Sequence, residues 1–384
     1  NRRGINKMSA AGIIFSNIHD SNISELTRMR TLASVPFGCR YRLIDFTLSN
    51  MVNSGITNVN VITHYNYHSL MDHLGTGKDW DLARARGGIK LFPPYVAAFA
   101  TNMSASYDTR LEALKGINDA ISHMTDDYVV LLDCDVICNI DLNDIINDHI
   151  ESGADITMAV KHATLTTEQA RINTLISSNE RGEITDVMSY PTNFSGEADI
   201  SLNILVMSRT YLQTMVYDAI AHGFVSMNRD IISKNIGHAN FRVYRYDGYF
   251  AVISSMTDYF DHSMELISRP EVRRELFREK QRPIYTKVRN SPPTKYINGS
   301  TVKNSFIADG CVIEGTVENS ILFRGVKIGK KTTVKNSILF QDTFTGENVT
   351  LNYVLTDKDV VVRDRTVLSS AKTMPIYVPK GRML

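Results

Sequence analysis

The stretch SVPFGCRYRLIDFTLSNMVNSGITNVNVIT, residues 34–63, joins a helix-like segment to a strand-like one. In DFTLSNMVNSGI (45–56) apolar residues recur at helical spacing, and a glycine marks the end. In NVNVIT (58–63) valine and isoleucine form a short run that is typical of a strand. A helix followed directly by a strand is the repeating unit of α/β folds, so this stretch predicts that class.

The same alternation extends from Ala10 to about Val252. We expect strands at AGIIF (11–15), NVNVIT (58–63), YVVLLD (128–133), DITMAVK (155–161), ILVMS (204–208) and FRVYRY (241–246). Helix-like stretches lie at 45–56, 111–124 and 141–153. Continuous apolar strands that alternate with helices predict a mostly parallel sheet. A ligand would bind at the carboxyl ends of the strands, near the loops 16–23 and 133–139.

A different pattern begins after a charged helical stretch (265–282) that is followed by three prolines. The string V-x-N-S-[FI]-[IL] occurs at 302–307, 317–322 and 334–339, and a weaker echo, TLNYVL, ends at Leu355. Short steps with inward aliphatic residues, separated by Gly and Asn, fit the stacked coils of a parallel β-helix. The alternative is a β-sandwich with accidental similarity between its strands.

Composition excludes several classes of protein. The 384 residues carry a net charge of +1, which gives no general attraction to nucleic acid or membrane. No run of 18 apolar residues and no signal peptide is recognisable, so we expect a cytoplasmic protein. The four cysteines are expected to be reduced thiols, and the histidines form no metal-binding cluster.

The turn after the first strand has no glycine. SAAGIIF (9–15) reads as a buried strand, and SNIHDSNI (16–23) follows it. Backbone amides close on a phosphate where no Cβ intervenes, which is why phosphate-binding loops are usually rich in glycine. The turn stands where such a loop is expected but lacks its chemistry.

Together with the C-terminal repeats, the motif PFG-x-RYR-x-IDF-x-LSN-x-x-NSGI at 36–56 resembles bacterial glucose-1-phosphate adenylyltransferase, or ADP-glucose pyrophosphorylase. YVVLLDCDVI (128–137) fits the central strand of that family, whose members join ATP and glucose 1-phosphate into ADP-glucose with Mg²⁺. The resemblance implies a Rossmann-like nucleotidyltransferase domain at 8–255, a helical connector at 256–291 and a left-handed parallel β-helix at 292–384.

The resemblance also locates the phosphate loop. The family's G-G-x-G-T-R-L falls on residues 17–23, and its three glycines fall on Asn17, Ile18 and Asp20. An acidic residue at this position would repel a triphosphate. The arginine of the motif falls on Asn22, which removes a cation whose contribution to the transition state is roughly 3–4 kcal/mol.

The other binding elements of the family are altered as well. The nucleobase segment Y-R-G-T-A-D-A keeps Tyr107, but Thr109, Arg110 and Leu111 replace its small residues. One metal carboxylate survives as Asp135, with Asp133 before it, whereas the second falls on Val252. The lysine that meets the sugar phosphate falls on Tyr190. Tyr107, Asp133 and Asp135 would be remnants of a substrate and metal pocket.

With these losses the chain resembles the accessory, GlgD-type subunits of that family, and the resemblance implies a non-catalytic, regulatory subunit with a role in glycogen biosynthesis. Its partner would be a catalytic glucose-1-phosphate adenylyltransferase chain in a hetero-oligomer, which we expect to be a tetramer. We expect no catalytic residue, no metal and no required cofactor. The resemblance also implies an anionic sugar-phosphate effector, and the candidate residues for it are Arg40, Arg42, Arg363 and Arg365.

Two alternatives remain. The first is an active nucleotidyltransferase with a rebuilt site, which would use Mg²⁺ and would need Arg110 or Lys78 as a replacement cation. The second, suggested by the β-helix alone, is a hexapeptide-repeat acyltransferase. Residues 294–384 contain no histidine that could act as its general base, which argues against it.

Overall fold

The computed structural model describes residues 9–93 and 107–384, and Met8, the expected start of the α/β domain, lies outside them. The chain divides into two compact units. The α/β unit takes the described parts of residues 1–18, 46–250 and 280–285, and the β-helix unit takes 19–45, 251–279 and 286–384. The segment that follows the first strand therefore belongs to the same unit as the C-terminal coils.

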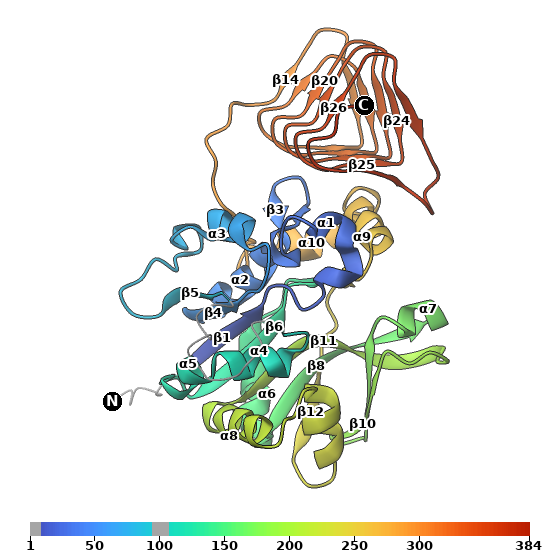
Figure 1. Ribbon diagram of the computed structural model, residues 1–384. Coiled ribbons are helices and arrows are strands. Elements are labelled where there is room, and N and C mark those ends of the chain that lie inside the picture. Colours follow the sequence, from blue (N-terminus) through green and yellow to red (C-terminus); the bar gives the residue numbers. More distant parts are fainter. Residues whose placement is uncertain (1–8, 94–106) are drawn as a thin grey trace. The chain divides into compact units, whose positions relative to one another are not determined.

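A nine-stranded sheet forms the centre of the α/β unit (Figure 1). Its strands are β1 (Ala10–Phe15), β4 (Asn58–Ile62), β5 (Gly88–Phe92), β6 (Tyr128–Asp133), β8 (Ile156–Leu165), β9 (Thr174–Ser178), β10 (Ile184–Ser189), β11 (Gly196–Ser208) and β12 (Phe241–Arg245). The neighbours β6, β1, β4 and β5 are parallel, whereas β11 is antiparallel to β6, β8 and β9. The six predicted strands are confirmed, and the parallel half of the sheet carries the loops of interest.

Helices cover this sheet. They are α2 (Leu43–Asn53), α3 (His68–Leu74), α4 (Arg110–Gly116), α5 (Asn118–Ser122), α6 (Leu142–Ser152), α7 (Thr167–Ala170) and α8 (Arg209–Ala221), with the 3-10 helix η3 (Lys78–Trp80) and the π-helix η5 (Met227–Ser233). The single helix expected at 111–124 is instead two short helices, α4 and α5, that meet at Ile117. Apolar residues of α4, α5 and α8 form one core cluster with residues of the sheet. Helix α2 packs so closely that a Cβ at Gly12 would lie 2.1 Å from the Met51 sulfur.

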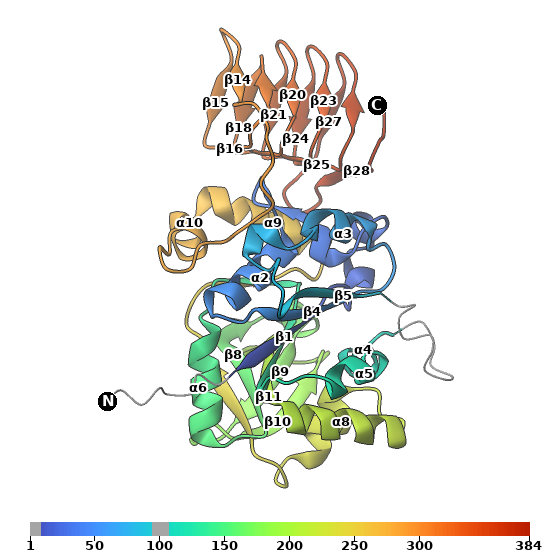
Figure 2. The same cartoon turned by 90° about the vertical axis from the view of Figure 1, so that its left-hand side faces the viewer.

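The C-terminal coils form a left-handed parallel β-helix with three faces, seen as stacked turns in Figure 2. The first face contains β14 (Lys295–Tyr296), β17 (Val312–Ile313), β20 (Lys327–Ile328), β23 (Phe344–Thr345) and β26 (Val361–Val362). The second contains β15 (Thr301–Lys303), β18 (Thr316–Glu318), β21 (Thr333–Lys335), β24 (Thr350–Asn352) and β27 (Val367–Ser369). The third contains β16 (Phe306–Ile307), β19 (Ile321–Leu322), β22 (Ile338–Leu339), β25 (Val354–Thr356) and β28 (Ile376–Val378). The predicted β-helix is confirmed.

The repeated Asn-Ser pair turns the corner between two faces. Asn304, Asn319 and Asn336 have φ of 41°, 46° and 46°, a left-handed conformation that asparagine tolerates better than most residues. Their side chains form a ladder, in which the Asn336 amide donates to the next coil over 2.9 Å. The serines act similarly, since the backbone N–H of Ser337 donates to the Ser320 hydroxyl (3.1 Å). The repeat in the sequence is thus a hydrogen-bonding pattern between coils.

The remaining elements of the β-helix unit are short, apart from the 13-residue helix α9. They are η1 (Asp20–Ile23), α1 (Ser24–Thr27), η2 (Leu32–Ser34), β2 (Pro36–Phe37), β3 (Tyr41–Arg42), α9 (Met256–Ser268) and α10 (Pro270–Phe277). Tyr259 of α9 is fully buried, and its hydroxyl donates to the Pro36 carbonyl over 2.5 Å. Its ring also contacts Phe340 of the coils, with 6.1 Å between centroids. Among the described residues, no helix combines the length and apolar composition needed to cross a membrane.

Candidate functional site

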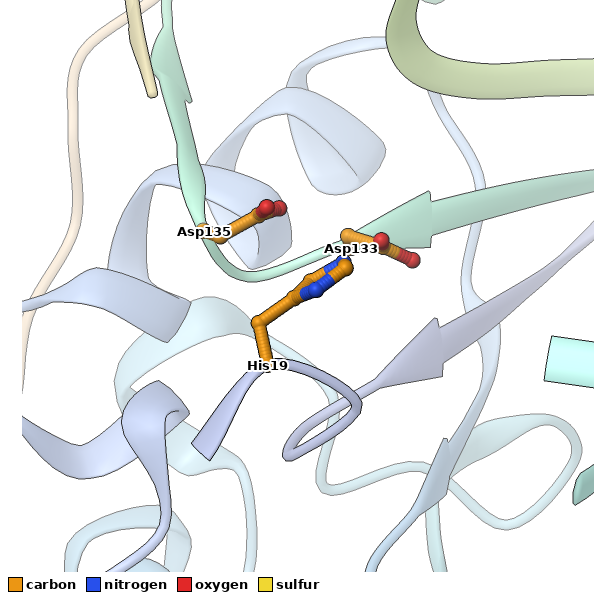
Figure 3. Close-up of side chains that lie close together, drawn as sticks. All are labelled: His19, Asp133 and Asp135. Carbon is orange, nitrogen blue, oxygen red and sulfur yellow. The ribbon is translucent and has the colours of Figure 1, made fainter. Parts of the chain in front are cut away.

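Two buried aspartates mark the carboxyl end of the central strand. Asp133 is the last residue of β6, and Asp135 stands before β7 (Val136–Cys138), so the two carboxylates flank one tight turn (Figure 3). Each residue is only 4% exposed. A third side chain with a metal-ligating atom, His19, follows Ile18 directly in the chain and is labelled in the same view. A buried carboxylate requires a cation or several hydrogen bonds, because desolvation of its charge is costly.

The guanidinium of Arg110 supplies this cation to Asp133. Nε of Arg110 lies 2.8 and 3.0 Å from the two carboxylate oxygens, and Nη2 also contacts Oδ2. The side chains are 13% and 1% exposed. Burial alone would lower the pKa of Arg110, but the charges of Asp133 and, more weakly, Asp135 raise it above its ordinary value. The guanidinium is therefore permanently charged and is bound to both oxygens of Asp133.

The start of α4 fixes the position of Arg110. Thr109 caps the helix, because its hydroxyl accepts the backbone N–H of Glu112 (3.2 Å) while the Glu112 carboxylate accepts the Thr109 N–H (3.2 Å). Such a capping box defines the first helical residue. Leu111 is fully buried in the core. The first turn of α4 is therefore held at two points, by the ion pair of Arg110 and by the packing of Leu111.

Asn17 and Ile18 stand at the first two glycine positions of the family's phosphate loop, and the side chains of both contact other residues. The Tyr107 hydroxyl donates to Oδ1 of Asn17 over 2.9 Å, and the Tyr107 ring lies against His64 with 4.9 Å between centroids. Ile18 is half-buried and packs against the core of the α/β unit. The turn after β1 is therefore held by its own side chains within this unit.

Asp20 and Asn22 lie on η1 in the β-helix unit. Oδ1 of Asp20 accepts the backbone N–H of Leu32 over 2.7 Å, and the Asp20 carbonyl accepts the Thr27 hydroxyl over 2.7 Å. Burial raises the pKa of Asp20 to about 8, although the Leu32 N–H opposes this shift. Asn22 is exposed. Asp20 is thus a structural residue of its own loop.

This shift predicts a pH-dependent stability. The pKa of Asp20 is raised from 3.8 to about 8, so the folded state binds more protons than the unfolded state between these values and stability falls as pH rises through this window. We expect Asp20→Asn, which keeps the acceptor for Leu32, to remove most of that loss, about 3 kcal/mol over the interval measured below. Urea unfolding at about pH 5.5 and about pH 8.5 measures it. Exposed Asp359→Asn is the control; an equal change in both variants contradicts the assignment.

Tyr190 and Val252 replace charged groups of the family. Tyr190 has a φ of 56° and is 49% exposed. Burial raises the pKa of Tyr190, the charge of Arg110 opposes this shift, and the charges of Asp135 and Asp133 add to it. The phenol therefore lies near the turn formed by residues 133–135, which we call the acidic turn. Val252 ends β13 (Phe250–Val252) and offers no oxygen to a metal. Lys78, a candidate replacement cation, is exposed on η3.

These residues do not fit Mg²⁺, the ion that the resemblance implies. Mg²⁺ prefers oxygen ligands, of which the protein usually supplies one or two carboxylates. Both oxygens of Asp133 are bound by Arg110, and the position of the second family carboxylate is Val252. A guanidinium beside the turn would also repel a second cation.

The four arginines expected to bind an effector differ in their surroundings. Arg42 is 6% exposed and lies beside Lys358. Arg40 is exposed, with its guanidinium 5.7 Å from the centre of the Tyr41 ring. Arg363 and Arg365 are both exposed on the coils, where Nη2 of Arg363 lies 2.9 Å from the Met383 sulfur.

The sequence did not single out the partners of Arg42. Burial lowers the pKa of Lys358 to about 7, and the nearby charges of Arg42, Arg30 and Arg289 add to this effect. Arg30 is 3% exposed and pairs through Nη2 with Asp357 at 2.8 and 3.0 Å. Nη1 of Arg30 is buried and has no hydrogen-bond partner among the described residues. We call these residues, Arg30, Arg42, Arg289 and Lys358, the basic cluster.

Comparison with known proteins agrees with both parts of the fold. Residues 19–230 match a family model described as nucleotidyl transferase, and residues 292–373 match one described as GlmU-like, C-terminal hexapeptide. The chain is 38% identical to "Glycogen biosynthesis protein GlgD" of Bacillus subtilis over 96% of this chain and 95% of that protein. It is 39% identical to the protein of the same name from Geobacillus stearothermophilus, over 85% and 82%.

A third relative has an enzyme's name. The chain is 32% identical to glucose-1-phosphate adenylyltransferase of Thermosipho africanus, over 84% of this chain and 77% of that protein. The sheet, the acidic turn and the coils thus define the class of nucleotidyltransferases that carry a hexapeptide β-helix. Within this class, the chain belongs to the family of glucose-1-phosphate adenylyltransferases and GlgD proteins.

Proposed function

We propose that this chain is a cytoplasmic regulatory subunit of glucose-1-phosphate adenylyltransferase in glycogen biosynthesis, with no catalysis of its own. It would pair with a catalytic chain in a hetero-oligomer, a tetramer, and change that chain's response to effectors. The observation that carries the proposal is the buried ion pair of Arg110 and Asp133. In this pair a guanidinium of the protein binds the carboxylate that stands two residues before Asp135, the position of a metal ligand in the family. Two relatives named for glycogen biosynthesis support the process.

The chemistry of the reaction explains why this pair matters. Transfer between phosphates depends on positioning and on cations that neutralise developing charge. In this chain, Arg110 binds a carboxylate instead of a phosphate, and Asn22 and Tyr190 carry no charge that could replace it. The alternative of a rebuilt active site needed Arg110 or Lys78 as a replacement cation, and the ion pair with Asp133 argues against Arg110 in that role.

Reconstitution with a catalytic glucose-1-phosphate adenylyltransferase chain tests the proposal. We expect the purified chain alone, with ATP, glucose 1-phosphate and Mg²⁺, to form no ADP-glucose above the background of an enzyme-free control. Mixed with the catalytic chain, it should elute as a larger complex and change the effector dependence of the rate. ADP-glucose formation by the chain alone, or a mixture that behaves as the catalytic chain by itself, would reject the proposal.

The basic cluster is the candidate effector site within this proposal. Its charges lie on two chain segments of one unit, 19–45 and 286–384, and the buried Nη1 of Arg30 could donate to an anion. Regulation requires that the anion bind two conformations of the complex with different affinity. We therefore propose an anionic sugar phosphate as the effector, bound by Arg42, Lys358 and Arg30.

A further inference from the structure

We propose that Arg110 is a built-in cation that takes the place of a divalent metal ion at the acidic turn after β6. The chain would then need no metal to keep Asp133 and Asp135 buried, and it would exclude a metal from them. The inference rests on the proposed absence of catalysis and adds how the turn is kept stable without the family's metal.

The charges at the turn support this role. Asp133 and Asp135 are each 4% exposed, and two adjacent buried carboxylates repel each other unless a cation lies between or beside them. The guanidinium of Arg110 binds Asp133 through two nitrogens, the geometry in which arginine pairs most strongly with a carboxylate. A metal ion would have to displace the Arg110 guanidinium before it could bind Asp133.

The backbone holds the guanidinium in place in advance. The capping box of Thr109 and Glu112 begins α4 at Arg110, and buried Leu111 fixes the rotation of that turn. Asp133 is fixed by β6, which pairs with β1 on one side and β11 on the other. Both partners are therefore rigid before they meet, so little ordering opposes the pair.

Binding of Mn²⁺, used as a probe for Mg²⁺, tests the inference on the full chain. We expect the wild type to bind Mn²⁺ at the acidic turn on the order of 100-fold more weakly than Arg110→Met does, because a unit charge a few ångströms away opposes the metal. Arg110→Met should have a lower melting temperature than the wild type in EDTA and regain part of it with Mn²⁺. Calorimetry and thermal denaturation measure these effects, and Lys78→Met, an exposed cation, is the control.

A second variant covers the case in which Arg110→Met fails to fold. Arg110→Met/Asp133→Asn removes both charges, so it should fold without metal, melt above Arg110→Met in EDTA and lose the gain in Mn²⁺ affinity. Tight binding of Mn²⁺ to the wild type that Asp135→Asn abolishes would overturn the inference. It would also be overturned if the double variant were no more stable than Arg110→Met. These readouts need neither ADP-glucose formation nor a partner chain, so this inference and the proposed function can fail separately.

Discussion

Replacing Asp357 by asparagine is expected to lower the free energy of unfolding by about 3–5 kcal/mol, the usual cost of removing one partner from a buried ion pair. Arg30 and Asp357 are 3% and 5% exposed in their side chains. Asp357 also accepts the Tyr377 hydroxyl (3.1 Å) and the backbone N–H of Lys358 (2.7 Å). Asparagine keeps the shape of this centre but removes the negative charge that Arg30 binds, so the positive charges of the basic cluster would repel one another.

The chain offers a matched exposed pair as control. Lys372 and Asp261 lie 3.8 Å apart with side chains 69% and 42% exposed, and such a pair contributes about 0–1 kcal/mol. Urea unfolding of Asp357→Asn and Asp261→Asn compares the two sites directly. In Arg30→Met/Asp357→Leu, which removes both buried charges, much of the lost stability should return. If Asp357→Asn costs no more than Asp261→Asn, Asp357 does not stabilise the cluster.

The fold could be predicted largely because its signals are local. Strand runs such as YVVLLD (128–133) and the Asn-Ser corners at 304, 319 and 336 reveal their structure within a few residues. The break at Ile117 was not predicted, because 111–124 keeps apolar residues at helical spacing across it. The edge strand β10 and its neighbour β9 were also missed, since tertiary pairing rather than a continuous apolar run determines them.

The candidate site could be predicted only in part. The resemblance located Asp133, Asp135 and Arg110, but it gave no reason for Arg110 to bind Asp133, which lies 23 positions further along the chain. That contact depends on where α4 begins. Arg30 and Asp357 were missed altogether, because 327 positions separate them and each looks like an ordinary surface charge in the sequence. Long-range charge pairing has no periodic signal.

Anion binding at the basic cluster is expected to weaken as pH rises through 7, by up to about tenfold per pH unit. Burial and neighbouring arginines hold the pKa of Lys358 at about 7, so its ammonium is lost near neutral pH. A bound anion favours the charged form and raises this pKa again. Binding above pH 7 therefore takes up one proton, whereas binding well below pH 7 takes up none and reaches a plateau. Sulfate is the suitable probe, because its own charge is constant over this range.

Calorimetric titration with sulfate and with fructose 1,6-bisphosphate, at about pH 6 and about pH 8.5, measures the effect. Lys358→Met should bind either anion more weakly at the lower pH, and its affinity for sulfate should not change between the two pH values. Lys358→Arg, which remains charged, should keep its affinity at the higher pH. Arg42→Met should weaken binding roughly 10- to 100-fold at both values, since it removes a charged donor. Arg363→Met, an exposed arginine of the same unit, is the control. If Arg363→Met reduces affinity and Arg42→Met does not, the effector binds elsewhere on the coils and the basic cluster is only structural.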